Sequence, residues 1–107
     1  MFHKFPRGFK VVEPAPGFLV RAVSGERLML CDVVLQADSE SPLHSHPYEE
    51  MGLILEGEFE MTIGNDTLPL TRGDIYLVPP GIVHGGITHE QKTLLVSAYS
   101  PPREDYK

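Results

Sequence analysis

The alternation of apolar and polar residues is the strongest pattern in this chain. In the segment 58–63, Phe59, Met61 and Ile63 alternate with polar residues, which is typical of a strand buried on one face. The segment Arg27–Gln36 is apolar at nearly every position, as expected for a strand covered on both faces. Both patterns predict a fold built from strands.

Further short segments of this kind follow one another between turn signals such as Gly64-Asn65-Asp66. We expect strands over residues 17–23, 27–36, 51–55, 58–63, 67–70, 75–78, 83–88 and 93–99. Ala37–Pro42 is expected to be a polar loop. Ten glycines and ten prolines in 107 residues leave little room for helix. The sequence therefore predicts an all-β single domain, a sandwich or barrel over 17–100.

The two ends of the chain differ from this pattern. Residues 1–16 mix basic and aromatic side chains with Pro14 and Pro16, which predicts an arm or an edge strand. The tail over 101–107 is polar and proline-rich. An arm of this kind can cross to a second subunit, so we expect a homodimer formed through the arm or the edge strands.

Charge and cysteine content narrow the function classes. A net charge of −6 argues against nucleic acid, because phosphate binding needs a basic patch. No apolar stretch approaches the roughly 20 residues of a membrane span, and the N-terminus does not resemble a signal peptide. The single cysteine, Cys31, lies in an apolar run, which predicts a buried, inert thiol and a reducing cytoplasm.

Candidate chemistry is concentrated in the segment 44–50, which reads HSHPYEE. His44 and His46 leave the same face of an extended chain, and Glu50 can return to that face after an irregular segment at Pro47. His84 ends a second segment, GDIYLVPPGIVH. Imidazole nitrogens and a carboxylate oxygen are suitable ligands for a divalent transition metal. Two histidines alone also fit a solvated loop, and a one-residue slip in register would present Glu49 instead.

The spacing of these residues carries a family resemblance. The segment HxHxxxE is followed after six residues by Gly57, and the second segment places Gly73, Pro79 and Gly81 ahead of the histidine. In this order the two segments resemble the paired motifs of the cupin superfamily. The resemblance implies a double-stranded β-helix, also called a jelly-roll barrel. Its metal (Ni, Mn, Fe, Zn or Cu) would be held by His44, His46, Glu50 and His84.

Two positions depart from the superfamily pattern. Asp38 stands where a glycine is frequent, and Thr88 stands where an asparagine is frequent. Neither position is a ligand, so these departures affect only the expected turn geometry.

Within the superfamily, the chain is most similar to small single-domain cupins of pectin and alginate breakdown. Those enzymes open a 4,5-unsaturated uronate into its linear keto form, which implies a carboxylated sugar as substrate. Tyr99 and Arg103 match an aromatic and an arginine of that group, and these are the expected catalytic residues. The acid of the group falls on Ser97, and a serine hydroxyl is a poor proton shuttle. The third metal ligand of that group is often a glutamine, where this chain has Glu50.

Alternatives remain open for the arginine and for the function. Arginine suits a carboxylate, but spacing alone favours a surface pair between Arg103 and Glu104 or Asp105. A metal held by three histidines and a glutamate also suits a dioxygenase of a small molecule. A third alternative is a sugar- or ligand-binding cupin without turnover. Tyr48 fits either a pocket wall or the surface, whereas His3 and His89 are expected to be solvated.

Overall fold

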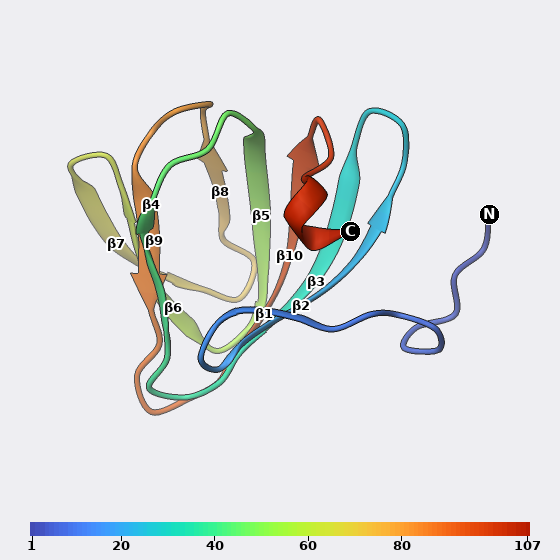
Figure 1. The fold of residues 1–107 in the computed structure, drawn as a ribbon. Helices are drawn as coiled ribbons and strands as arrows, with labels where there is room; N and C mark the ends of the chain where they lie inside the picture. The colour runs from blue at the N-terminus through green and yellow to red at the C-terminus, as the bar shows by residue number, and fades with distance from the viewer.

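The computed structural model describes all residues from Met1 to Lys107 and consists of two antiparallel sheets that face each other (Figure 1). The strands are β1 (Val12–Ala15), β2 (Phe18–Ser24), β3 (Met29–Leu35), β4 (Glu40–His44), β5 (Glu49–Glu56), β6 (Glu58–Ile63), β7 (Asp66–Thr71), β8 (Ile75–Val78), β9 (His84–Ile87) and β10 (Thr93–Ser100). A single 3₁₀ turn, η1 (Glu104–Tyr106), follows the last strand. No helix of this chain has the length and apolar character needed to cross a membrane.

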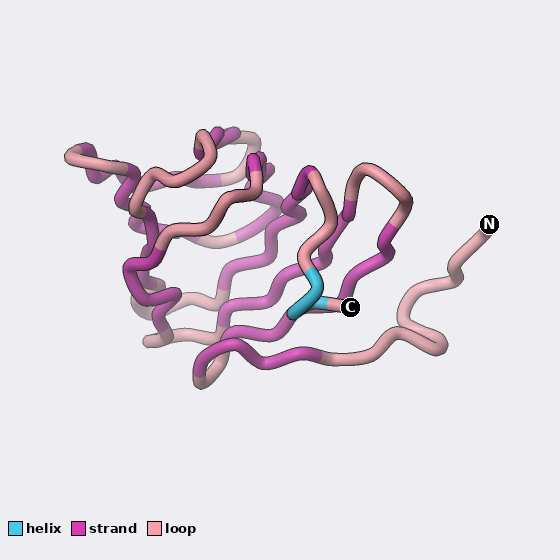
Figure 2. Tube along the Cα trace, turned by 45° about the horizontal axis from the view of Figure 1, so that its top comes forward, coloured by secondary structure: helices cyan, strands magenta, loops and turns pink.

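The two sheets differ in size. One contains six strands in the order β1-β2-β3-β10-β5-β8, and the other contains four in the order β4-β9-β6-β7. Figure 2 shows the two layers of strands enclosing a common interior. This architecture confirms the prediction of an all-β double-stranded β-helix, and the expected strands 51–55, 58–63, 75–78 and 93–99 are all present within a residue or two of their ends.

One predicted loop is wrong. The segment Ala37–Pro42 was expected to be irregular, yet β4 begins at Glu40 and pairs with β9, placing Ser41 opposite Gly86. This strand has no apolar alternation, since only Ser41 is buried, and its partner lies more than 40 residues along the chain. Pairing of the backbone rather than side-chain pattern therefore decides its conformation.

Inward-facing residues of both sheets form one core. Its members share full or nearly full burial and include Val20, Met29, Cys31, Val33, Leu35, Ile54, Phe59, Met61, Tyr76, Val78, Leu95, Tyr99 and Tyr106. Burial raises the pKa of the Cys31 thiol to about 12, which keeps it protonated and confirms the expected inert cysteine.

The departures at Asp38 and Thr88 meet in one turn. Asp38 has φ of 52°, and it is the only residue other than glycine with a positive φ. Aspartate tolerates this left-handed conformation better than most residues, which explains how it replaces a glycine. The Thr88 hydroxyl donates to the Gln36 carbonyl at 2.6 Å and accepts from the Ser39 amide at 2.9 Å, so it ties this turn to the end of β9.

The two ends of the chain take different roles. β1 pairs with β2 at the edge of the larger sheet, whereas residues 1–11 lie outside both sheets and contact β2, where the Arg21 guanidinium lies over the Phe5 ring (Figure 1). The tail is not simply a polar extension, because Arg103 and Tyr106 are both buried. Their burial brings the C-terminus back onto the barrel.

Gly52 in β5 leaves room for the ring of Tyr76. A Cβ at this glycine would overlap the ring, which lies on the neighbouring strand directly opposite Gly52. We expect Gly52→Ala to displace Tyr76 and lower the free energy of unfolding by about 1–3 kcal/mol, as overpacked cores do. Gly25→Ala is the matched control, since a Cβ there meets only one carbonyl oxygen at 3.3 Å. Equal urea midpoints for the two variants would contradict this role of Gly52.

Candidate metal centre

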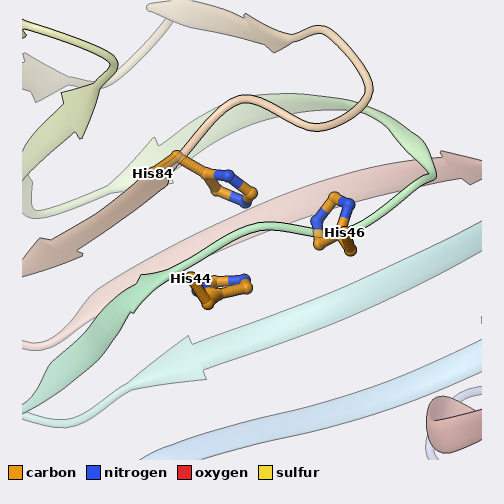
Figure 3. A group of neighbouring side chains, drawn as sticks. All are labelled: His44, His46 and His84. Atoms are coloured by element: carbon orange, nitrogen blue, oxygen red, sulfur yellow. The ribbon is translucent and has the colours of Figure 1, made fainter.

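Three histidines are brought together by the pairing of β4 with β9. His44 ends β4 and His84 begins β9, and the two are direct register partners. His46 follows two residues later in the loop before β5. Figure 3 shows all three rings pointing toward a common space. One ligand atom from each ring lies within 4.8 Å of the others, so the fold brings the three histidines together.

Glu50 reaches the same space from the opposite sheet. Its Oε1 lies 3.0 Å from His46 Nε2 and 3.2 Å from His84 Nε2. Glu50 is buried and faces inward on β5, whereas Glu49 is exposed. The register therefore selects Glu50 over its neighbour.

Each imidazole is oriented by its other nitrogen. Nδ1 of His44 donates to the Pro42 carbonyl at 2.6 Å, and Nδ1 of His84 donates to the Ile82 carbonyl at 2.8 Å. Nδ1 of His46 likewise donates to the Tyr48 carbonyl at 3.1 Å. Because a carbonyl oxygen only accepts hydrogen bonds, Nδ1 carries the proton in each ring and Nε2 is the nitrogen left to bind a metal.

Tyr76 completes the environment of the carboxylate. Its hydroxyl donates to Glu50 Oε2 at 2.6 Å, so Oε1 faces the histidines and Oε2 faces the tyrosine. Burial alone would raise the pKa of Glu50, but the contacts of its Oε1 with the His46 and His84 imidazoles and the hydrogen bond from the Tyr76 hydroxyl lower it to about 2. The carboxylate is therefore ionised at neutral pH.

The histidines differ in their electrostatic surroundings. Burial lowers the pKa of His44 despite its hydrogen bond to the Pro42 carbonyl. Burial also acts to lower the pKa of His84, but hydrogen bonds to Glu50 and to the Ile82 carbonyl outweigh it and raise that pKa. His84 thus interacts directly with the carboxylate, whereas the half-buried His44 forms the more open side of the cluster.

These donors fit a divalent transition metal. Three imidazole nitrogens and one ionised carboxylate converge from two sheets, and hydrogen bonds of the kind that orient metal ligands hold every donor. All four ligand candidates from the sequence are therefore at one place in the fold. His3 and His89, expected to be solvated, are exposed.

Aromatic residues and one arginine surround the cluster on its C-terminal side. The rings of Tyr99 and His46 lie 5.8 Å apart between centroids. The Arg103 guanidinium carbon lies 5.0 Å from the centroid of the Tyr99 ring and 5.5 Å from that of Tyr48. Tyr48, which sequence reasoning left undecided, therefore lies beside the site. The alternative prediction of a surface ion pair is confirmed for the partner, since Arg103 pairs with Asp105. It is wrong about the location, because Arg103 is only 8% exposed.

A cavity of about 30 Å³ lies between the sheets and is lined by His44, Glu50, His84, Ser97 and Tyr99, among others. The Ser97 hydroxyl is buried and has no hydrogen-bond partner. The cavity has room for water but not for a sugar ring. A ligand of that size must bind at the mouth, where half-buried Tyr48 lies.

Sequence reasoning missed Tyr76 and Tyr106. A signal existed for Tyr76, because it shares a face with Val78 in a correctly predicted strand, and a buried tyrosine needs a partner for its hydroxyl. No local pattern marks Tyr106, since its burial depends on the turn that follows two prolines.

An antiparallel barrel with three histidines and a carboxylate at one mouth has the architecture of a cupin with a candidate metal centre. The family model described as "Cupin domain" matches residues 31–98, well over half of the sequence. The chain therefore belongs to the cupin domain family, which confirms the resemblance seen in its motifs.

Two curated relatives are similar to this chain. "H2HPP isomerase" of Bacillus subtilis is 34% identical over 65 residues, covering 60% of this chain and 28% of that protein. "Pectin degradation protein KdgF" of Dickeya dadantii is 26% identical over 84 residues, covering 78% of this chain and 76% of that protein. The chain thus spans well under half the length of the first relative and most of the second.

Solved structures agree with the fold. An RmlC-like cupin from Shewanella frigidimarina superposes with a TM-score of 0.88 at 25% identity, covering 97% of this chain and 94% of that one. KdgF from Halomonas sp. superposes with a TM-score of 0.84 at 23% identity, covering 92% and 91%. The barrel of this chain is therefore similar to both over nearly its full length.

His84 allows a direct test of metal binding. We expect the protein to bind one equivalent of Ni²⁺ and to gain about 2.7 kcal/mol in free energy of unfolding at a free metal concentration of 100 times Kd. His84→Ala should lose this gain, because it removes an oriented Nε2 donor. His89→Ala, which removes an exposed imidazole, should keep it. Urea unfolding with and without Ni²⁺ measures the gain, and an equal gain in both variants would place the metal elsewhere.

Proposed function

We propose that this protein is a metal-dependent cupin that opens a 4,5-unsaturated uronate into its linear keto form. One observation carries the proposal: Tyr99 and Arg103 lie beside the four ligand candidates. The Tyr99 ring lies 5.8 Å from the His46 ring between centroids, and the Arg103 guanidinium carbon lies 5.0 Å from the centroid of the Tyr99 ring. A sugar acid has an oxygen-rich ring and a carboxylate, and this mouth offers a partner for each. The similarity to KdgF points the same way.

The substrate's carboxylate belongs on Arg103. Burial disfavours the charge of this side chain, but its hydrogen bonds to Asp105 raise the pKa of Arg103 above its ordinary value, so the guanidinium stays cationic. A carboxylate bound there lies beside Tyr99, whose ring can stack against the apolar face of the sugar. When bound, the metal supplies a Lewis acid for a sugar oxygen.

The reaction is an isomerisation: it opens the ring and transfers one proton overall, without oxidation or reduction. The anomeric hydroxyl loses its proton, the bond from C1 to the ring oxygen breaks as the C1 carbonyl forms, and C4 gains a proton as the C5 oxygen becomes a ketone. Burial, together with the charge of Glu50, raises the pKa of Tyr99, so this residue remains a neutral phenol and acts as a donor. Its hydroxyl is the proposed donor of the proton that C4 receives, and the proton lost by the anomeric hydroxyl returns through solvent to the Tyr99 oxygen, so that no proton is gained or lost overall.

Ser97 supports a second candidate, a sugar-binding cupin without turnover. Its unpartnered hydroxyl lines the cavity where the similar enzymes have an acid, and a serine hydroxyl transfers protons poorly at neutral pH. The two candidates bind the same class of ligand and differ only in whether it is consumed.

Metal-loaded protein mixed with freshly generated 4,5-unsaturated uronate tests turnover. We expect the enol-ether ultraviolet absorbance to fall faster than it does spontaneously. Arg103→Ala should lower kcat/KM by roughly 10²-fold, because the charge-assisted carboxylate contact is lost. Arg72→Ala, in an exposed turn, is the control and should match the wild type. Binding without acceleration would favour the sugar-binding candidate. If this sugar neither binds nor turns over, the proposal fails, and oxygen uptake with other small molecules would then test the dioxygenase alternative.

We also propose that the protein is a cytoplasmic homodimer, with a different interface from the edge strands or arm expected from the sequence. The outer face of β5, β8 and β10 exposes a continuous apolar patch. Its members are register neighbours: Met51, Leu53, Ile75, Leu77, Val96 and Ala98. Unpaired Cys31 supports a reducing compartment.

A second copy is the occupant that this patch favours. Together with Leu30 and Leu55, these side chains expose an apolar surface on the order of 500 Å². This area is in the upper range of apolar patches on monomeric proteins. It is also most of the roughly 800 Å² that one partner buries in a stable complex. The patch carries no charge, so an identical patch related by two-fold symmetry complements it. Val96 also lines a groove together with Phe5 and Phe9, so the arm can extend the interface.

Leu77→Glu tests this interface. We expect the wild type to sediment at twice the mass of one chain and Leu77→Glu to sediment as a monomer, since a charge would be buried without a partner. Leu43→Glu places the same charge on an exposed position of β4 in the smaller sheet, outside the patch, and should remain dimeric. A monomeric wild type, or dissociation of both variants alike, would exclude this face as the interface.

A further inference from the structure

We infer that Asp105 is a positioning residue that holds one edge of the Arg103 guanidinium and leaves the other edge to bind a ligand carboxylate. The inference rests on the proposed function, because it concerns how that function's substrate is held. It assigns a role to a residue in the C-terminal tail, outside the strands that form the barrel.

The hydrogen bonds of Arg103 are unevenly distributed. Its Nε donates to Asp105 Oδ1 at 3.1 Å, and its Nη2 donates to Asp105 Oδ2 at 2.8 Å. Its Nη1 is buried and has no hydrogen-bond partner. A buried donor without a partner is unfavourable and rare in native structures, and a bound ligand that accepts its hydrogen bond would explain it.

The guanidinium has two edges that match a carboxylate. Asp105 binds the edge formed by Nε and Nη2 and leaves the second edge, formed by Nη1 and the remaining N–H of Nη2, where the buried Nη1 has no hydrogen-bond partner. Asp105 therefore does not compete with a ligand for Arg103. It fixes the plane of the guanidinium and determines which edge faces a ligand.

Aromatic rings restrict the guanidinium in the other directions. The Arg103 Cζ lies 3.9 Å from the centroid of Tyr106, and the Tyr106 ring meets Tyr99 edge to face at 5.7 Å. Tyr106 is buried and lines the cavity beside the histidines. The short turn η1 thus supplies both Asp105 and Tyr106, and together they fasten Arg103 to the mouth of the barrel.

This arrangement predicts a preference for ligands that carry a carboxylate. A sugar with a neutral hydroxymethyl group in its place offers no charge to the open edge. Without Asp105, the Arg103 guanidinium would be mobile before a ligand binds. Ordering it on binding would then cost free energy, and the preference for a carboxylate would weaken.

Asp105→Asn tests the inference, with Glu104→Gln as its control. Asparagine has the size of aspartate but removes the negative charge that pairs with Arg103. Because the Asp105 side chain is 59% exposed, the barrel should still fold. Glu104 belongs to the same turn but pairs only with Lys107. Calorimetric titration of Ni²⁺-loaded protein would use D-galacturonate as the probe and D-galactose as its neutral counterpart.

We expect Asp105→Asn to weaken galacturonate binding by roughly tenfold and to leave galactose and Ni²⁺ binding unchanged. Glu104→Gln should match the wild type. With the unsaturated uronate, KM should rise by a similar factor while kcat stays within about twofold, which a general loss of folding would not produce. Asp105→Glu, which retains a carboxylate, should recover part of the loss.

The inference is overturned if Asp105→Asn binds galacturonate as tightly as Glu104→Gln or more tightly, since tighter binding would mean that Asp105 blocks the site. It is also overturned if the wild type shows no preference for galacturonate over galactose. Loss of binding in Asp105→Asn without turnover in any variant would support the inference while refuting the proposed reaction. Turnover with equal KM in Asp105→Asn and Glu104→Gln would support the proposed reaction while refuting the inference.

Discussion

Hydrogen bonds from the three Nδ1 atoms to main-chain carbonyls determine what this site can do. Nδ1 of His44, His46 and His84 donates to the carbonyl of Pro42, Tyr48 and Ile82, in that order. The three Nε2 atoms are then left facing the same space. These carbonyls lie within two residues of their histidines, so the local backbone fixes the ring orientation. The pairing of His44 with His84 then brings two of the rings together, and the opposite sheet supplies Glu50.

The larger sheet contributes the groups that adjust the carboxylate and bind around it. Tyr76 reaches Glu50 because Gly52 leaves space for its ring, and Tyr99 lies opposite Glu50 on the neighbouring strand. The chain has four tyrosines and no tryptophan, and all four lie around this one site. A mouth lined by phenols and one cationic arginine suits an oxygen-rich, negatively charged small molecule better than an apolar one.

The sequence predicted the site better than it predicted the path of the chain. Alternation and motif spacing identified His44, His46, Glu50 and His84, because residues two apart on an extended chain share a face. Strand β4 was missed, since its conformation comes from pairing with β9 and not from its own pattern. The burial of Arg103 and Tyr106 was also missed, because a polar, proline-rich composition does not reveal a tail that folds back onto the barrel. Contacts between segments distant in sequence were the part that local patterns could not supply.

Three Nε2 atoms and Glu50 converge on one place in the fold, where we expect them to bind a single metal. A crystal structure of the Ni²⁺-loaded protein, with the metal located by its anomalous scattering, tests this most directly. The account predicts a single strong peak about 2.0–2.2 Å from the three Nε2 atoms, with the Nδ1 bonds to carbonyls intact, as imidazole–metal distances require. A metal bound through any Nδ1, or a peak remote from His44, His46 and His84, would contradict it.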